Sequence, residues 1–189
     1  RGHHLILLAK NKAGYHNLAK MVSYAFTEGY YYHPRVDKEL LRTYHEGIIC
    51  CSACLGGELP QAIMHGDRAK AEAVVREFKE IFGEDYYLEM QLHRSGDPRR
   101  DSEVYENQKR VNAVILELAA QYGIKYIASN DVHFIKAEDA EAHDRLICLN
   151  TGKDLDDPTR MRYTGQEFLK SPEEMAELFA EHPEALATT

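Results

Sequence analysis

The chain has 189 residues, of which 44% are hydrophobic and 29% are charged, an ordinary composition for a globular protein with a substantial core. Its formal net charge of -8 argues against a domain that holds duplex DNA through a basic face of its own, because phosphate neutralisation supplies much of that affinity. No apolar run approaches the roughly 20 residues of a membrane helix and no signal peptide is present, so we expect a cytoplasmic protein with reduced cysteines and no membrane contact.

Four short segments rich in apolar, β-branched or aromatic residues predict strands. They are Leu5–Ala9, Ile48–Ala53, Tyr86–Gln91 and Tyr126–Ser129. Their starts lie about 40 residues apart, which fits one βα unit with a generous loop. Because parallel strands need such crossovers, the pattern predicts an α/β fold with helices outside the sheet, either a doubly wound sheet or part of a barrel.

Apolar side chains at helical spacing predict helices between these strands. The first helix ends near Gly29, the second stops at Gly83 and the third closes at Gly123. A further helix is predicted to start at Ser171-Pro172-Glu173-Glu174, an N-cap followed by a helical Pro and a capping-box Glu, and to run to about Ala180. The three apolar stripes are Tyr15, Leu18, Val22 and Ala25; Ala71, Val74, Val75, Phe78 and Ile81; and Val111, Val114, Ile115, Leu118 and Tyr122.

The strongest candidate for chemistry is Asp131 with His133, directly after the last predicted strand. In parallel α/β folds, functional groups collect where strands end, and residues i and i+2 of an extended chain point the same way. A carboxylate with an imidazole suits zinc, manganese or iron. The alternative is an Asp that caps the next helix beside a surface His.

Cys54 is the second candidate, because it lies where the strand around Cys51 runs into a glycine turn and its thiolate could reach a metal there. Cys51 and Cys54 also form a C-x-x-C pair, but no second pair exists and Cys148 stands alone, so a redox or zinc-ribbon function is weakly supported. Cys50 and Cys51 are predicted to be small core residues of a buried strand.

The tandem histidines His3-His4 precede the first strand and are either ligands or part of a linker, while His93 follows the third strand and could line the same end. The remaining histidines lie on helices or loops, where solvated or locally bonded side chains are the favoured reading. They are His16, His33, His45, His65, His143 and His182. From the residues alone, the sequence predicts an α/β protein with a candidate metal site and plausible hydrolytic chemistry.

A series of short motifs runs in order along nearly the whole chain. They are His4–Asn11, Gly14-Tyr15 with Asn17-Leu18, Glu28–Tyr31, Pro34–Asp37, Ser52–Pro60, Asn130–Phe134, Glu138–Asp144, Thr151–Lys153 and Leu155–Pro158. In this order and spacing they resemble the PHP domain of bacterial DNA polymerase III alpha subunits, rather than PHP proteins at large.

The resemblance implies a distorted β/α barrel with a cluster of zinc or manganese ions at one end. The metal ligands it implies in this sequence are His4, Cys54, Asp131 and His133, with Asp131 and His133 also catalytic; Glu89 and His93 would support them. Further family ligands, including a His-x-His, are absent from this sequence. The chain opens without an initiator Met, so we expect one incomplete PHP domain over 1–189, the C-terminal portion of the barrel with roughly four βα units, inside a longer product. Residues 151–189 would form a polar loop and helices that lead out of the barrel.

The resemblance also implies a function for the parent protein, DNA-directed DNA synthesis from deoxynucleoside triphosphates beside other replisome subunits, with magnesium in a polymerase domain that is absent here. The PHP domain itself would be a metal-dependent 3′–5′ exonuclease or a vestigial form of one. The alternatives are a non-catalytic structural or interaction module and a free-standing PHP phosphoesterase, against which Leu155–Pro158 argues. We expect the fragment alone to be inactive, and to self-associate because an incomplete barrel exposes strand edges.

Overall fold

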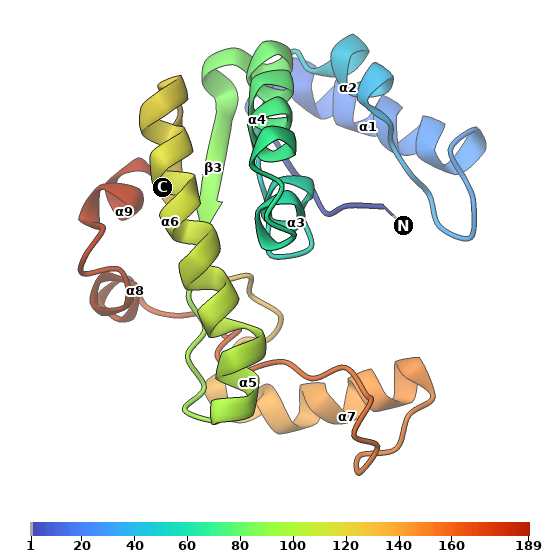
Figure 1. The fold of residues 1–189 in the computed structure, drawn as a ribbon. Helices are drawn as coiled ribbons and strands as arrows, with labels where there is room; N and C mark the ends of the chain where they lie inside the picture. The colour runs from blue at the N-terminus through green and yellow to red at the C-terminus, as the bar shows by residue number, and fades with distance from the viewer. Residues whose placement is uncertain (1) are drawn as a thin grey trace. The chain divides into compact units, whose positions relative to one another are not determined.

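The structure, a computed structural model, describes residues 2–189 as a mixed α/β chain (Figure 1). Its strands are β1 (Ile6–Ala9), β2 (Ile48–Cys51), β3 (Tyr86–Met90) and β4 (Lys125–Ala128). Its helices are α1 (Lys12–Thr27), α2 (Lys38–Tyr44), α3 (Glu58–Met64), α4 (Arg68–Phe82), α5 (Pro98–Glu103), α6 (Tyr105–Tyr122), α7 (Ala140–Thr151), α8 (Pro172–Leu178) and α9 (Pro183–Thr188), with 3₁₀ turns at Gly83–Asp85 and Ala137–Asp139. All four predicted strands are present, each within two residues of the predicted ends.

The strands form one sheet in the order β1-β2-β3-β4, which confirms the α/β class; closure into a barrel stays a prediction. β2 runs parallel to β3, as the crossover through α3 and α4 requires. β1 runs antiparallel to β2, with Ile6 opposite Cys51 and Ala9 opposite Ile48, so the parallel crossover expected between consecutive strands does not hold for this pair. The reason lies in α2, a second helix between β1 and β2 that the apolar pattern did not predict, which lets the chain enter β2 from the opposite end.

The chain forms two compact units. The first comprises the residues up to Glu89 together with Val114–Tyr126. In it α1 packs against α2 and β1, and α3 packs against α4 (Figure 1). Its core is built by the predicted stripe of α4, with Val75 fully buried and Phe78 stacked on Tyr86, and Gly83 caps that helix as predicted.

The second unit comprises Met90–Ala113 and Ile127–Thr189. α8 packs against α9, and the hydroxyl of Thr189 exchanges hydrogen bonds of 3.2 Å with both backbone groups of Ala128. The predicted capping box at Ser171 is confirmed: its hydroxyl accepts from the Glu174 amide, and the Glu174 carboxylate accepts from the Ser171 amide. The stretch after α7 carries no helix before α8, as the polar composition predicted.

The predicted buried face of α1 was wrong in part, because Ala25 is buried as predicted but two other members of the stripe are exposed. Tyr15 is 64% exposed and Val22 is 53% exposed, whereas Gly14, Met21 and Ala25 are buried. The cause is Gly14, which lies so close to the backbone of Gly47 that a side chain there would overlap it. A glycine contributes nothing to an apolar stripe, so the sequence pattern assigned the face one position away from the true contact.

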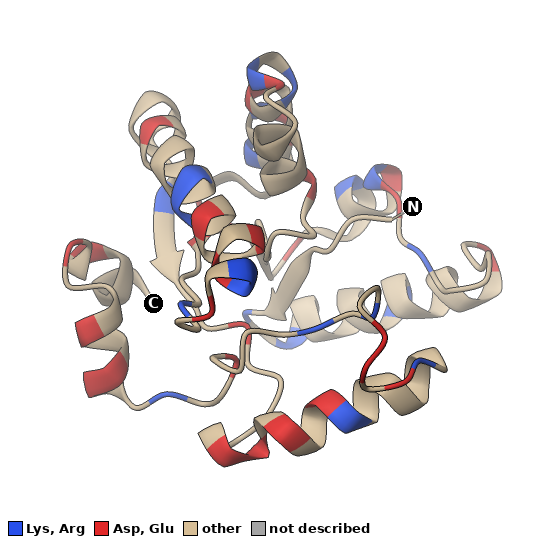
Figure 2. Ribbon diagram, turned by 60° about the horizontal axis from the view of Figure 1, so that its bottom comes forward, with Lys and Arg blue, Asp and Glu red and all other residues tan. Residues whose placement is uncertain are grey.

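β1 stands at the end of the strand order, with Ile6 42% and Leu8 51% exposed. Apolar side chains are therefore exposed at this edge, as expected, while self-association through them stays a prediction. Acidic and basic residues are interspersed over the helices (Figure 2). Among residues 2–189, no helix combines the length and apolar character needed to cross a membrane.

Candidate metal centre

His4 and Cys54 lie together at one edge of the sheet, in the first unit. The Nδ1 of His4 is 3.3 Å from the Sγ of Cys54, and the His4 amide donates to the carbonyl of Gly56 at 3.0 Å. The antiparallel direction of β1 explains this pairing, because the residue before β1 then lies beside the residues that follow β2. If β1 ran parallel to β2, His4 would lie at the other end of β2, away from Cys54. Two of the four predicted ligands are thus in contact.

The turn that carries Cys54 depends on an unusual backbone. Ala53 is buried and has φ +65°, a left-handed conformation that is uncommon for residues other than glycine. Gly56 lies against the imidazole of His4, and a Cβ on Gly56 would come within 2.9 Å of its Nδ1. A strained residue of this kind persists only where its surroundings hold it in that conformation. The glycine therefore makes room for the His4 ring next to the thiol.

Asp131 and His133 form the second pair, in the second unit. The Oδ1 of Asp131 is 3.6 Å from the Nε2 of His133, and each side chain is 34% exposed. The segment is not extended as predicted, because Asp131 has φ +43°. The side chains meet through this left-handed residue rather than through strand alternation. The two side chains lie close together, as the sequence predicted, but through a different backbone conformation, and their function as metal ligands stays a prediction.

Asn130 ties this pair to the rest of the second unit. Its side-chain amide donates to the carbonyls of Gln166 and Phe168 at 2.9 and 2.7 Å, and the His133 amide donates to the Glu167 carbonyl at 2.8 Å. Its side-chain oxygen Oδ1 is buried and has no hydrogen-bond partner among the described residues. A buried acceptor of this kind costs free energy unless a donor reaches it. A metal-bound water would be such a donor, so the residues around Asp131 fit a hydrated cation.

The buried side chain of His93 forms a hydrogen bond with the backbone of Asn130. Its Nε2 lies 3.0 Å from the carbonyl of Asn130, and its Nδ1 lies 3.0 Å from the side-chain nitrogen of Gln108. Since the Gln108 amide can only donate through nitrogen, Nδ1 is the acceptor and Nε2 carries the proton. Burial lowers the pKa of His93, against the opposing effect of the Glu167 carboxylate 3.8 Å away. His93 is therefore a neutral positioning residue whose hydrogen bond fixes the backbone before Asp131.

Glu89, the other residue expected to support the ligands, is buried in the first unit. Its backbone amide donates to the hydroxyl of Ser52 at 2.9 Å, two residues before Cys54. Through that bond it holds the strand that leads into the cysteine turn. Its support of His4 and Cys54 beyond this contact stays a prediction.

His143 and Tyr163 are neighbours of His133 that the sequence reasoning missed. The Tyr163 ring lies 4.5 Å from the His133 ring and 5.0 Å from the His143 ring, and the two imidazoles are 5.7 Å apart. His143 had been grouped with the solvated histidines because it lies on a helix. The one sequence signal for His143 was its place in the motif Glu138–Asp144. Its contacts with His133 and Tyr163 join separate segments of the chain, so residue spacing could not predict them.

Cys50 and Cys51 are buried core residues, as predicted. Cys148 is buried too, and no disulfide joins any of the four cysteines. Burial raises the pKa of the Cys51 thiol to about 12 and also raises the pKa of Cys50 well above its ordinary value, so both stay protonated and are poor ligands. Cys51 and Cys54 form no disulfide. Cys54 differs in being partly exposed and next to an imidazole.

The structure thus brings the predicted ligands together as two pairs, one in each unit. Within residues 2–189, no group of three or more His, Cys, Asp or Glu side chains is arranged to hold a metal ion. Each pair supplies two donors of types that zinc and manganese accept. A tight site needs more donors than either pair provides, because affinity follows ligand number and geometry.

Comparisons with known proteins show similarity to PHP domains and to DNA polymerase III alpha subunits. The family described as PHP domain matches residues 1–93. The DNA polymerase III subunit alpha of Treponema pallidum (strain Nichols) is 42% identical over 191 residues, which cover 100% of this chain and 16% of that protein. The protein of the same name from Borreliella burgdorferi is 43% identical, covering 99% of this chain and 16% of its own length, and that from Thermus aquaticus is 42% identical, covering 94% and 14%. The chain therefore spans about a sixth or less of the length of these relatives.

Proposed function

Since this chain carries a PHP domain and is related along its whole length to DNA polymerase III alpha subunits, we propose that it is part of such a subunit and contributes a metal-binding site for phosphodiester hydrolysis. The whole subunit would extend DNA in chromosome replication, alongside other replisome proteins. The PHP site would remove nucleotides from a 3′ end. The observation that carries the proposal is the pairing of Asp131 with His133 next to the unsatisfied Oδ1 of Asn130.

Within each unit the pair present there would hold a cation, Asp131 with His133 in one unit and His4 with Cys54 in the other. When bound, a zinc or manganese ion supplies hydroxide near neutral pH and stabilises the attacking and leaving oxygens of a phosphodiester. The family-type ligands that this sequence lacks would complete the coordination in the longer subunit. Each pair includes one member at a left-handed residue, since Cys54 directly follows Ala53 and Asp131 is itself left-handed, and backbone strain of this kind recurs at functional sites.

The protein's own groups have distinct tasks in this proposal. Asp131 and His133 bind the cation. Each side chain is one third exposed, so the end of a DNA strand can reach it. Neutral His93 keeps the carbonyl of Asn130 in place and thereby the backbone of Asp131. The Asn130 Oδ1 would accept a hydrogen bond from a water on the cation, which removes the cost of its burial.

The alternative is a non-catalytic module that stabilises the polymerase. It is favoured by one observation, that the part of the chain described here holds no group of three or more metal-binding side chains. On this alternative, His4 with Cys54 and Asp131 with His133 would be remnants of a site. The two functions differ in their response to manganese, which only the first requires.

The test uses the full-length alpha subunit that contains this chain. Substitution of Asp131→Ala is expected to abolish manganese-dependent 3′ excision from a single-stranded oligonucleotide, while primer extension continues at the wild-type rate. Asp154→Ala, which removes an exposed carboxylate from a loop in the same unit, is the matched control and should leave both activities unchanged. Excision that persists in the Asp131→Ala subunit would refute the nuclease and leave the structural module.

Metal content of the 189-residue chain gives a second check. We expect weak binding, less than one equivalent of zinc or manganese after dialysis, and no nuclease activity, because two donors in each pair are too few. Elemental analysis of the purified chain measures this directly. A stoichiometric metal ion that survives dialysis would show that the ligand set present here is sufficient.

A further inference from the structure

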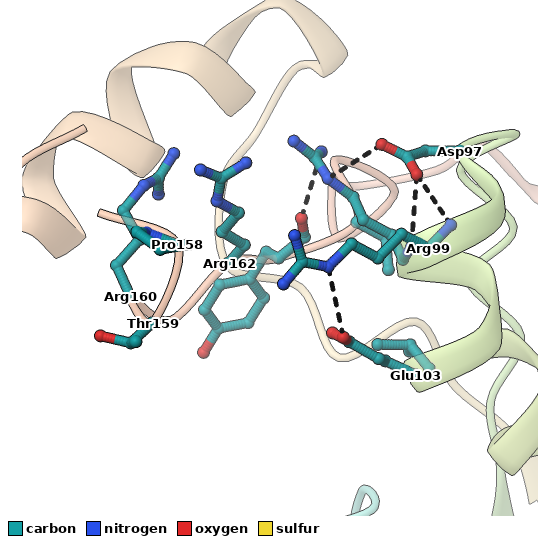
Figure 3. A pocket seen from close by; sticks show the side chains of 11 residues that line it. Asp97, Arg99, Glu103, Pro158, Thr159, Arg160 and Arg162 are labelled. Atoms are coloured by element: carbon teal, nitrogen blue, oxygen red, sulfur yellow. Dashed lines mark hydrogen bonds and ion pairs between the residues drawn. The ribbon is translucent and has the colours of Figure 1, made fainter. Parts of the chain in front are cut away.

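A pocket of about 280 Å³ in the second unit is lined by side chains from α5 and from the loop at residues 158–164. Figure 3 shows Arg160 and Arg162 on one side and Arg99 on the other. Arg100 adds a fourth guanidinium, and the pocket's acidic side chains are those of Asp97 and Glu103. Four positive and two negative groups give the lining a net charge of +2, on a chain whose net charge is -8. The lining is thus locally positive, although the charge of Arg160 is paired with Asp144 outside it.

Arg160 has a structural task. Its guanidinium forms a bidentate ion pair with Asp144, with nitrogen–oxygen distances of 2.5 and 2.7 Å. It also donates a hydrogen bond to the Leu155 carbonyl at 2.9 Å. Its side chain is 4% exposed. Arg160 therefore holds the loop against α7 and leaves its neighbours to face the pocket.

The other guanidinium groups are weakly engaged. Arg99 lies 3.7 Å from the carboxylate of Glu103, and Arg100 lies 3.8 Å from that of Asp97, both too far for a hydrogen bond. The side chain of Arg162 makes one long contact in the described chain, 3.4 Å to the carbonyl of Leu155. Each of these side chains has several N–H donors available for a ligand.

The pocket adjoins the Asp131–His133 pair through Tyr163. Tyr163 lines the pocket, and its ring lies 4.5 Å from the ring of His133. The Arg100 guanidinium also lies 3.4 Å from the Tyr163 carbonyl. An anion among the arginines would therefore sit one aromatic ring away from a proposed metal ligand.

We propose that this pocket binds the phosphate of a nucleotide at the end of a single strand. Guanidinium groups match phosphate oxygens with paired, charge-assisted hydrogen bonds, and arginine is among the residues that contact phosphates in nucleic-acid complexes. A volume of about 280 Å³ lies just below the roughly 300–1,000 Å³ of small-molecule sites, which suits one nucleotide and excludes a duplex. The nucleotide identity rests on the proposed function; anion binding by the arginines does not.

The experiment measures binding to the 189-residue chain by calorimetry in EDTA, at low salt, with three probes: inorganic phosphate, thymidine 5′-monophosphate and a short oligothymidylate. Arg162→Ala should weaken binding of the nucleotide about tenfold, the effect of losing one or two charge-assisted hydrogen bonds. Arg162→Lys should fall between, because it keeps the charge and loses the planar fork. The control is Arg145→Ala, which removes an exposed guanidinium on α7 outside the pocket and should change affinity less than about twofold.

Binding of the nucleotide more tightly than inorganic phosphate, with the loss confined to the pocket variants, supports the proposal. Equal affinity for both probes overturns the nucleotide assignment, and equal weakening by Arg145→Ala overturns the pocket. Unchanged far-UV circular dichroism of Arg162→Ala and Arg162→Lys excludes unfolding as the cause. Because this binding is measured in EDTA, whereas excision by the full-length subunit requires manganese, failure of the nuclease and failure of this pocket give different results.

Discussion

The Nδ1 of His4 lies 3.3 Å from the Sγ of Cys54, although fifty residues separate them in the chain. The contact exists because β1 is antiparallel to β2, which brings the residue before one strand to the end of the other. It also distinguishes Cys54 from the other cysteines, which are buried. Cys54 should therefore react faster with thiol reagents than the three buried cysteines.

At pH 8, a thiol-specific reagent should label one cysteine rapidly in the folded chain, and that cysteine should be Cys54. Cys50 and Cys51 stay protonated because burial raises the pKa of both thiols, and Cys148 is protected by its burial. The measurement is the number of thiols labelled in the first minutes, before and after denaturation. Cys54→Ser should remove the fast phase; a fast phase that remains in this variant would contradict the assignment.

Gly14→Ala should destabilise the protein, although alanine in a helix interior usually adds about 0.5–1 kcal/mol of stability relative to glycine. An added methyl group would overlap the carbonyl oxygen of Gly47, which is also held by a 2.8 Å hydrogen bond from the Lys10 amide. We expect a loss of about 1–3 kcal/mol in the free energy of unfolding, the range for overpacking. Denaturant titration measures it. Ala19→Gly, at an exposed position of the same helix, measures the effect of helix propensity alone. An unchanged or higher denaturation midpoint for Gly14→Ala would disprove the close approach of Gly14 to Gly47.

Asp144→Asn should lower the thermal midpoint by several degrees, because it leaves the buried guanidinium of Arg160 without its counter-charge. The matched control is Glu141→Gln on the same helix, which breaks an exposed ion pair with Arg145 and should have almost no effect. The difference should depend on pH. The hydrogen bonds from Arg160 lower the pKa of Asp144, so its stabilisation is present above the unfolded value near 3.8 and is lost as pH falls through the folded value. Equal midpoints for the two variants at pH 7 would contradict this role.

His93→Gln should change the pH dependence of stability. Burial lowers the pKa of His93 in the folded state, so between pH 8 and pH 5 the unfolded chain takes up a proton near its ordinary value of about 6.5 before the folded chain does. The wild-type protein therefore loses stability over this range, and the variant should lose less. Denaturant titrations at several pH values measure the slope. His65→Gln, which removes an exposed imidazole, is the reference, and parallel slopes for wild type and His93→Gln would show that His93 is not held neutral.

The sequence by itself determined the local structure and the chemical types at the site. Apolar runs and periodicity predicted the strands and the stripe of α4, because each depends on neighbours within a few residues. The capping box at Ser171 is equally local and was predicted with its hydrogen bonds. Order and spacing of motifs indicated the relationship to the PHP domain of polymerase III alpha subunits, which the comparisons confirm. The sequence also marked His4, Cys54, Asp131 and His133 as groups able to bind metal.

The tertiary structure decided which of these groups meet. The direction of β1 places His4 beside Cys54, and a left-handed Asp131, not an extended strand, sets its distance to His133. The approach of Gly14 to Gly47 determines which face of α1 is buried. The arginine pocket joins two segments about sixty residues apart, which no local pattern can bring together. Contacts of this kind depend on long-range packing, whose energy is shared among residues far apart in the chain, and are therefore invisible to periodicity, propensity and spacing.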